Sequence, residues 1–180
     1  MPRLHVPVTP TRPGDTPDFS YVALSAAGAI KRPRYDARAL DLDFLATGLV
    51  RVLDDDHRAK GPWDPKLDAE TLRSGLRHML LTRIYDERLQ RTQRAGKISF
   101  YMRSYGEEAV AVAQCMALQP GDMLFPSYRQ QGFYMVRGRP LVELMCQLLS
   151  NTRDMCKGRQ LPVMYHWKEG NIFSISGNLT

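Results

Sequence analysis

Hydrophobic residues between positions 68 and 96 recur every three or four residues, the spacing of one face of an α-helix. Asp68 is a residue type that caps helix N-termini, and Gly96 is one that commonly follows their ends. The pattern therefore predicts one long helix, with a buried face made of Leu72, Leu76, Met79, Leu80 and Ile84. Burial of each such side chain contributes about 1.5 to 3 kcal/mol, so this helix needs a large partner surface.

Two shorter helices are expected further along the chain. One begins after Gly106, where the charges of Glu107 and Glu108 favour a helix N-terminus, and it ends at 118–122. Its small residues allow a neighbour to approach closely, and they are Ala109, Val110, Val112, Ala113, Met116 and Ala117. The other helix follows Pro140, which suits a first helical position. Its apolar face is predicted to comprise Leu141, Leu144, Met145, Leu148 and Leu149.

Strand signals are short and scattered. Residues 21–24, with a turn at 26–30, and the alternating residues 49–53, with a turn at 54–56, predict two short strands. A loop is expected at 61–65, and a further strand is expected at 171–176, close to the end of the sequence. Because one or two strands cannot cover three amphipathic helices, the pattern indicates an incomplete layered α/β domain that is mostly helical.

The N-terminal region differs from the rest in composition. The first 20 residues contain five prolines, which hold the backbone extended and remove amide donors. We therefore expect an extended arm with short strands over 1–67 and the first part of the α/β domain over 68–180.

The overall composition is that of a soluble globular protein, with 43% hydrophobic and 24% charged residues. No apolar run reaches about 18 residues and no apolar segment follows Met1, so we expect neither a membrane span nor export. Cys115, Cys146 and Cys156 lack the spacing of a zinc site or a disulfide framework. Three reduced thiols suit a cytoplasmic protein.

The formal net charge is +6, and residues 88–180 hold 12 Lys and Arg against 6 Asp and Glu. Beyond residue 100 the arginines occur singly, at 103, 129, 137, 139, 153 and 159. Single arginines suit point contacts with an anionic small molecule better than binding along a nucleic-acid backbone. A basic interaction or RNA-binding module is the alternative, in which Tyr128, Tyr165 and Trp167 would stack on bases.

Segment 125–132 is the first candidate site. Tyr128 and Arg129 lie where a turn is expected to lead into a helix, and their phenol and guanidinium suit a dianion such as a diphosphate. An arginine paired with a surface carboxylate explains the same residues.

A second basic loop, at 156–162, offers Lys157, Arg159 and backbone amides around Gly158 to phosphate oxygens. A solvated basic turn is the competing interpretation. No His, Cys or carboxylate pair has the spacing of a metal site, and His166 is expected to be a packed residue rather than a base.

Five motifs occur in one order along the chain, at 97–102, 105–108, 127–132, 157–162 and 174–179. Together they resemble the α subunits of thiamine-diphosphate-dependent, branched-chain 2-oxo acid dehydrogenases. Residues 4–7, 18–21 and 61–63 are similar to the bacterial version of that subunit, so the resemblance covers nearly the whole chain.

This resemblance implies the N-terminal portion of a doubly wound α/β fold that binds thiamine diphosphate in an α2β2 heterotetramer with a β subunit. It implies that the cofactor is contacted by Tyr128, Arg129, Gly177 and Leu179, and that a potassium ion is held by Ser176 and Asn178. The Gly-Asp-Gly motif that holds magnesium in the family is absent, so the magnesium ligands and the catalytic histidines are expected beyond residue 180. No catalytic residue is expected within the chain.

The function implied is oxidative decarboxylation of a branched-chain 2-oxo acid, with transfer of the acyl group to the lipoyl arm of an acyltransferase core. The 180 residues alone are expected to be inactive, with no role for nucleic acid or membrane. A pyruvate or acetoin dehydrogenase α subunit is the enzyme alternative, and it would differ in the pocket around Phe100 and Tyr101.

Overall fold

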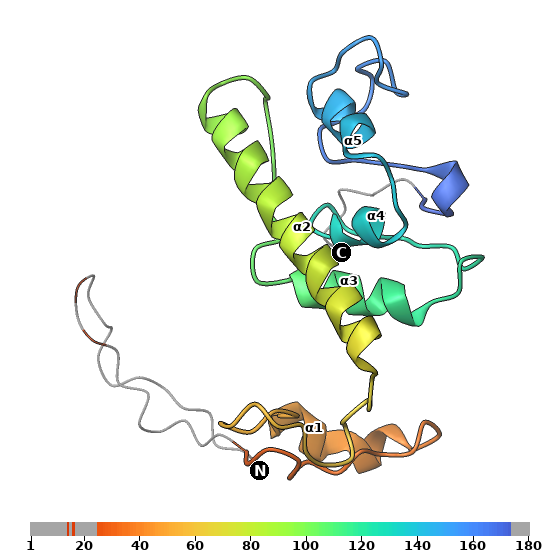
Figure 1. The fold of residues 1–180 in the computed structure, drawn as a ribbon. Helices are drawn as coiled ribbons and strands as arrows, with labels where there is room; N and C mark the ends of the chain where they lie inside the picture. Colours follow the sequence, from red (N-terminus) through yellow and green to blue (C-terminus); the bar gives the residue numbers. More distant parts are fainter. Residues whose placement is uncertain (1–13, 15, 17–24, 174–180) are drawn as a thin grey trace. The chain divides into compact units, whose positions relative to one another are not determined.

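The chain separates into two units, Met1–Lys66 and Leu67–Thr180, in the computed structural model (Figure 1). The structure describes residues 14, 16 and 25–173. Several predictions fall outside the described residues, namely the strand at 21–24 and the sites at Ser176, Gly177, Asn178 and Leu179.

The first unit contains a short 3-10 helix, η1 (Ala39–Leu42), which is followed directly by α1 (Asp43–Thr47). The turn expected at 26–30 is present. The indole nitrogen of Trp63 donates to the Ile30 carbonyl oxygen at 2.9 Å, which fixes the loop at 61–65 against this turn.

The strand predicted at 49–53 does not form among the described residues, so that prediction is wrong. Pairing there is limited to single points, including an antiparallel bridge between Leu53 and Ala59. The Asp54 carboxylate accepts hydrogen bonds from the amides of Asp56 and Arg58, at 3.0 and 2.9 Å. These side-chain bonds close the turn that the sequence predicted and end the ladder after one bridge.

The long helix predicted from the sequence is confirmed as α2 (Ala69–Arg94). The Asp68 carboxylate caps its start by accepting from the Thr71 amide and the Thr71 hydroxyl, both at 2.8 Å. Gly96 lies just past the end with a φ of +69°, a left-handed conformation that favours glycine. Local capping chemistry therefore sets both ends of the helix.

The buried face of α2 is different from the predicted one. Its leucine row is exposed to solvent, with exposed fractions between 53% and 64% at Leu72, Leu76, Leu80 and Ile84. The residues that are buried instead are Thr82, Tyr85, Asp86 and Leu89. The prediction is wrong because it rests on hydrophobicity alone. Thr82 and Asp86 form hydrogen bonds in the fold, and these bonds offset the cost of burying polar side chains.

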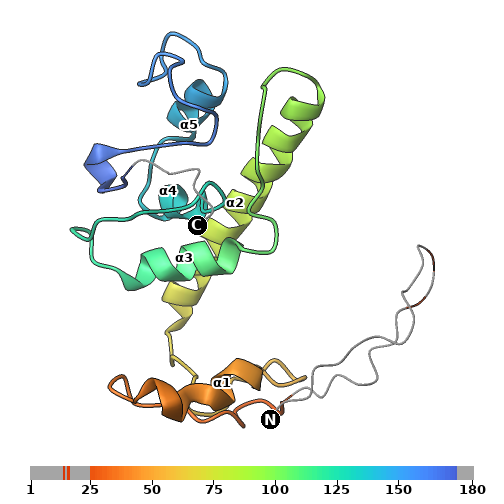
Figure 2. The ribbon, with the colours of Figure 1, turned by 180° about the vertical axis from the view of Figure 1, so that it is seen from behind.

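The second unit continues with α3 (Glu108–Ala117), α4 (Gly132–Val136), α5 (Leu141–Leu148) and the 3-10 helix η2 (Lys168–Gly170). Helices α2, α3 and α4 pack against one another, as both views show (Figures 1 and 2). At the contact of α3 with α4, a Cβ atom on Gly132 would lie 3.0 Å from the Cβ atom of Ala111. Glycine therefore permits this close approach.

The two shorter predicted helices are present, but their faces are only partly as predicted. In α3 the buried residues are Glu108, Ala111, Val112 and Cys115, so only Val112 of the expected set is buried. In α5 Leu144 and Leu148 are buried, whereas Leu149 is exposed because the helix ends at Leu148. Pro140 precedes the first helical residue instead of occupying it.

Four tyrosines, Tyr85, Tyr101, Tyr134 and Tyr165, lie in the core of the second unit, each 4% exposed or less. The rings of Tyr134 and Tyr165 meet edge to face, with centroids 5.3 Å apart. The Tyr134 hydroxyl donates to the Tyr165 carbonyl oxygen at 3.2 Å, and the hydroxyls of Tyr85 and Tyr165 lie 3.4 Å apart. The hydroxyl groups of these three tyrosines therefore find hydrogen-bond partners within the core.

The regular secondary structure of the described residues is mostly helical, as predicted, and their β-structure is confined to isolated bridges. The strand predicted at 171–176 is described only to residue 173, where Ile172 bridges Leu124 and Trp167. The layered α/β sheet stays a prediction. No helix in the described part of the chain combines the length and the apolar character needed to cross a membrane.

Candidate functional site

Cationic side chains gather where the loop between α2 and α3 meets the turn that precedes α4. The Arg129 guanidinium donates from Nη1 to the carbonyl oxygen of Arg103 at 3.0 Å, which joins the two segments. Beside this junction, the Cζ atoms of Arg83, on α2, and Arg103, in the loop, lie 4.0 and 5.1 Å from the ring centre of Tyr105. The site therefore brings together three guanidinium groups and an exposed phenol.

The turn before α4 is closed by its own side chains. The Ser127 amide donates to Oε1 of Gln130 at 2.8 Å, and the Arg129 amide donates to the Ser127 hydroxyl at 3.3 Å. Tyr128 and Arg129 occupy the centre of this turn, and both are half-buried. The predicted turn into a helix is confirmed here.

The two arginines that meet at the loop junction are outside the ion pairs of the described residues, although the charge of Arg103 also acts on the buried Asp86 carboxylate and lowers its pKa. Within the part of the chain that the structure describes, neither Arg103 nor Arg129 forms an ion pair with a carboxylate. The simpler interpretation of Arg129, a surface ion pair, is thus wrong for these residues. Two guanidinium groups without an ion pair among the described residues suit an anionic ligand.

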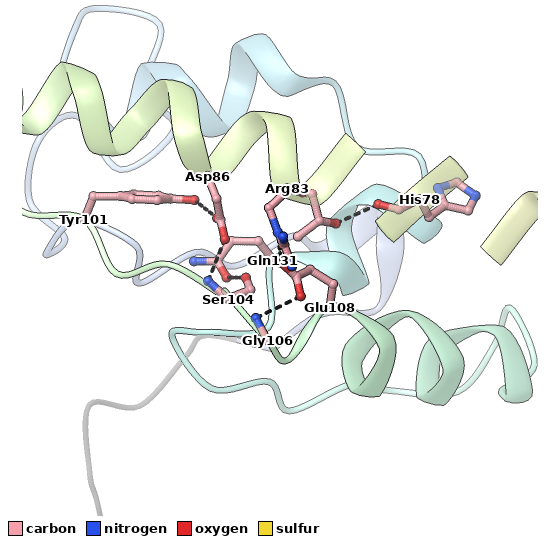
Figure 3. A network of polar contacts seen from close by, with 9 residues as sticks. His78, Arg83, Asp86, Tyr101, Ser104, Gly106, Glu108 and Gln131 are labelled. Carbon is pink, nitrogen blue, oxygen red and sulfur yellow. Dashed lines mark hydrogen bonds and ion pairs between the residues drawn. The ribbon is translucent and has the colours of Figure 1, made fainter. Parts of the chain in front are cut away.

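Asp86 anchors the loop from α2 (Figure 3). Its carboxylate is fully buried and accepts from the Tyr101 hydroxyl at 2.5 Å and from the Ser104 amide at 2.7 Å. Burial raises the pKa of Asp86, whereas the hydrogen bonds from Tyr101 and Ser104 lower it. Burial likewise raises the pKa of Tyr101, so its hydroxyl stays protonated as the donor.

Gln131 links the loop to the turn, also shown in Figure 3. Its Oε1 accepts from the Ser104 hydroxyl at 2.5 Å, and its Nε2 donates to the carbonyl oxygens of Met102 and Tyr128, each at 2.9 Å. The side chain is 1% exposed. Both amide N–H groups and the amide oxygen are therefore used, and they fix the two segments to each other.

Glu108, at the start of α3, closes the other end of the same loop. Its Oε1 accepts from Nε of Arg83 at 2.5 Å, and its Oε2 accepts from the Gly106 amide at 3.0 Å. The hydrogen bond from Arg83 holds the pKa of this buried carboxyl below its usual value, against the effect of burial. The position of Glu108 at a helix start predicts only an interaction with the helix dipole, and its Arg83 partner lies 25 residues away in the sequence.

Two parts of the chain match known protein families. Residues 76–180 match the family described as the dehydrogenase E1 component. This chain belongs to the dehydrogenase E1 family. Residues 1–40 of the E1 chain also match the N-terminal segment of 2-oxoisovalerate dehydrogenase E1 alpha subunits, and the family expected from the sequence motifs is thereby confirmed.

Curated relatives carry the same subunit name. The E1 chain is 55% identical over 177 residues to the 2-oxoisovalerate dehydrogenase subunit alpha of Pseudomonas aeruginosa, which covers 98% of this chain and 43% of that protein. The mitochondrial subunit of Mus musculus is 40% identical over 145 residues, 77% of this chain and 33% of that protein. The mitochondrial subunit of Caenorhabditis elegans is 39% identical over 117 residues, which are 65% of this chain and 27% of that protein. The chain thus spans less than half the length of these relatives.

The second basic loop of the E1 chain does not offer free amides. The Asp154 carboxylate accepts from the amides of Cys156 and Gly158, at 3.0 and 2.7 Å. The amides predicted to meet phosphate oxygens are therefore already bound to a carboxylate, so that part of the prediction is wrong. His166 is half-buried, with its Nδ1 atom 3.6 Å from the Cys156 sulfur.

Two further arginines of the E1 chain already bind carbonyl oxygens of the chain itself. Arg139 is 6% exposed and donates to the His166 carbonyl oxygen at 2.8 Å. Arg137 donates to the carbonyl oxygens of Gln119, Pro120 and Asp122, just beyond the end of α3. Among the singly spaced arginines, Arg103 and Arg129 are thus the ones at the loop junction. No cluster of potential metal ligands occurs in the described residues.

Proposed function

We propose that the chain forms part of the α subunit of a branched-chain 2-oxo acid dehydrogenase, which decarboxylates the oxo acid and passes its acyl group to a lipoyl arm. The observation that carries this proposal is the 55% identity to the Pseudomonas aeruginosa subunit alpha over 98% of the chain. The match of residues 1–40 to the N-terminal segment of such subunits supports the branched-chain class over a pyruvate or acetoin dehydrogenase.

In this proposal thiamine diphosphate is the cofactor, as the family implies. Bound thiamine diphosphate supplies the carbon nucleophile and the electron sink for decarboxylation. Tyr128 and Arg129 hold its diphosphate, and Arg103 adds positive charge beside them. The residues fit a dianion because neither arginine forms an ion pair in the described chain and the turn presents a phenol and a guanidinium together.

Arg129 is expected to contribute about 1.5 to 3 kcal/mol to cofactor binding through charged hydrogen bonds. In this proposal the side chains contribute to catalysis by compensating charge and orienting the cofactor, and they form no covalent bond with the substrate. In the same proposal, Gly177 and Leu179 touch the cofactor, and Ser176 and Asn178 hold potassium. The magnesium ligands belong to the longer subunit that the relatives represent.

A β subunit completes the proposed enzyme as an α2β2 heterotetramer that works with a lipoyl-bearing acyltransferase core. The exposed aliphatic row on α2 supports an assembly, since soluble monomers rarely expose a continuous apolar surface. It forms a shallow groove with two flanking arginines, lined by Arg73, Leu76, Arg77, Leu80, Leu81 and Ile84. The three cysteines are free thiols, which supports the cytoplasmic location that we include in the proposal.

The test is a rate comparison on the full-length α subunit assembled with its β subunit. Initial rates are measured with 3-methyl-2-oxobutanoate and with pyruvate, with and without thiamine diphosphate. The proposal predicts cofactor-dependent turnover and a higher kcat/KM for the branched substrate. A higher kcat/KM for pyruvate would show that the proposed substrate class is wrong. Equal rates with and without thiamine diphosphate would refute the proposed enzyme class.

A further inference from the structure

The Gln131 side chain donates to a carbonyl group in each of the two segments that form the anion site, the 95–107 loop and the Tyr128–Arg129 turn. Through Nε2 it holds the carbonyl oxygen of Met102, in the loop, and that of Tyr128, in the turn, each at 2.9 Å. It is 1% exposed and precedes the first residue of α4. Together with the hydrogen bond from Arg129 to the Arg103 carbonyl oxygen, Gln131 therefore holds the turn against the loop, and it does so from the buried side.

The amide orientation of Gln131 is itself fixed from α2. Ser104 donates its hydroxyl to Gln131 Oε1 at 2.5 Å and its amide to Asp86 at 2.7 Å. Ser104 also accepts from the Glu107 amide at 2.7 Å, so each of its polar groups has a partner. The chain of contacts runs from Asp86 on α2 through Ser104 to Gln131 (Figure 3). From Gln131 it continues to the carbonyl group of Tyr128.

We propose that Gln131 is a positioning residue for the cofactor diphosphate, because it fixes the Tyr128–Arg129 turn against the loop that carries Arg103. This inference rests on the proposed function. Gln131 does not touch the diphosphate in this account and acts through Tyr128 and Arg129. Hydrogen bonds weaken steeply as their geometry departs from linear, so a turn that shifts on the loop binds the diphosphate less well.

The test uses Gln131→Met in the full-length α subunit assembled with its β subunit. Methionine has a similar volume but neither donates to the two carbonyl groups nor fixes the Ser104 hydroxyl. The apparent KM for thiamine diphosphate is expected to rise by about tenfold. The kcat at saturating cofactor and the KM for 3-methyl-2-oxobutanoate are expected to stay within about twofold of wild type. A purely structural role would lower the active fraction without raising the cofactor KM.

Gln147→Met is the matched control. Gln147 is 4% exposed on α5, and its Nε2 donates to the Leu161 carbonyl oxygen at 2.7 Å, away from both segments of the site. The control is expected to lower Tm less than Gln131→Met does, because it loses one hydrogen bond and removes a buried amide oxygen that has no partner, and to leave the cofactor KM unchanged. A second variant, Ser104→Ala, keeps both donors of Gln131 but removes the hydroxyl that binds its Oε1 atom. It is expected to raise the cofactor KM by a smaller factor than Gln131→Met. It replaces Gln131→Met as the test if that variant does not fold.

Arg129→Ala separates this inference from the proposed function. If Arg129→Ala raises the cofactor KM while Gln131→Met and Ser104→Ala leave it at the wild-type value, the positioning role is wrong and the proposed function stands. An equal rise in Gln147→Met would also overturn the positioning role, because general destabilisation then explains the effect. A wild-type enzyme whose turnover ignores thiamine diphosphate would overturn both.

Discussion

Replacing Tyr101 with phenylalanine tests the buried anchor of the site. The change removes the hydroxyl that donates to Asp86 at 2.5 Å and keeps the ring, which is 4% exposed. A hydrogen bond to a charged, buried acceptor contributes about 1.5 to 3 kcal/mol. Since the Ser104 amide still donates to Asp86, we expect the unfolding free energy to fall by about 2 kcal/mol while Asp86 is ionised.

The cost of Tyr101→Phe should depend on pH. Burial raises the pKa of Asp86, and the Tyr101 hydrogen bond opposes that rise, so the variant has a still higher folded-state pKa. Between the ordinary carboxyl pKa and the raised one, the folded state binds more protons than the unfolded state. Unfolding free energy therefore falls as pH rises through this window, and it falls further in the variant. The difference from wild type is thus larger at about pH 8 than at about pH 5.

Tyr85→Phe is the control, because the Tyr85 and Tyr165 hydroxyls form a longer contact of 3.4 Å between groups whose pKa values burial raises. Its cost is expected to be about 1 kcal/mol and the same at both pH values. Urea unfolding followed by circular dichroism measures both variants. The reasoning is refuted if Tyr101→Phe costs no more than Tyr85→Phe at about pH 8, or if its cost does not change with pH.

Two further predictions concern the packing and the charges around the site. Gly132→Ala should lower the unfolding free energy by about 1 kcal/mol net, because its Cβ would press on Ala111 at 3.0 Å while alanine favours the helix. Gly121→Ala, with nothing within 4 Å of the added Cβ, should be near neutral in the same urea titration, and equal effects would contradict the argument. Glu108 has a lowered pKa through its Arg83 hydrogen bond, so its stabilising effect is present above the ordinary glutamate pKa and is lost as pH falls through the lowered one. The difference in unfolding free energy between wild type and Glu108→Gln should therefore shrink as the pH falls from about 6 to about 3. A constant difference would show that the Arg83–Glu108 ion pair does not cause it.

Local chemistry accounts for what the sequence predicted well. The Asp68 cap and the glycine at 96 determine the ends of α2, and both act within a few residues of themselves. The Tyr128–Arg129 turn was likewise predictable, since it is closed by Ser127 and Gln130 beside it.

The rest of the site depends on partners that are distant in sequence. Asp86 and Tyr101 are 15 residues apart, Ser104 and Gln131 are 27 apart, and Arg83 and Glu108 are 25 apart. A hydrophobic pattern cannot show such pairs, so it assigned the leucine row of α2 to the core and left Asp86 outside it. One missed feature did carry a local signal: Asp154 lies two residues before Cys156, a spacing at which aspartate commonly binds backbone amides.

The most direct measurement of the central claim is the calorimetric titration of thiamine diphosphate into the full-length α subunit assembled with its β subunit. It is done for wild type, for Arg129→Ala, and for Arg153→Ala as a control at an exposed arginine outside the site. We predict that Arg129→Ala weakens binding by about tenfold to about a hundredfold and that Arg153→Ala binds as wild type does. Wild-type affinity in Arg129→Ala would contradict the assignment of this turn to the cofactor diphosphate.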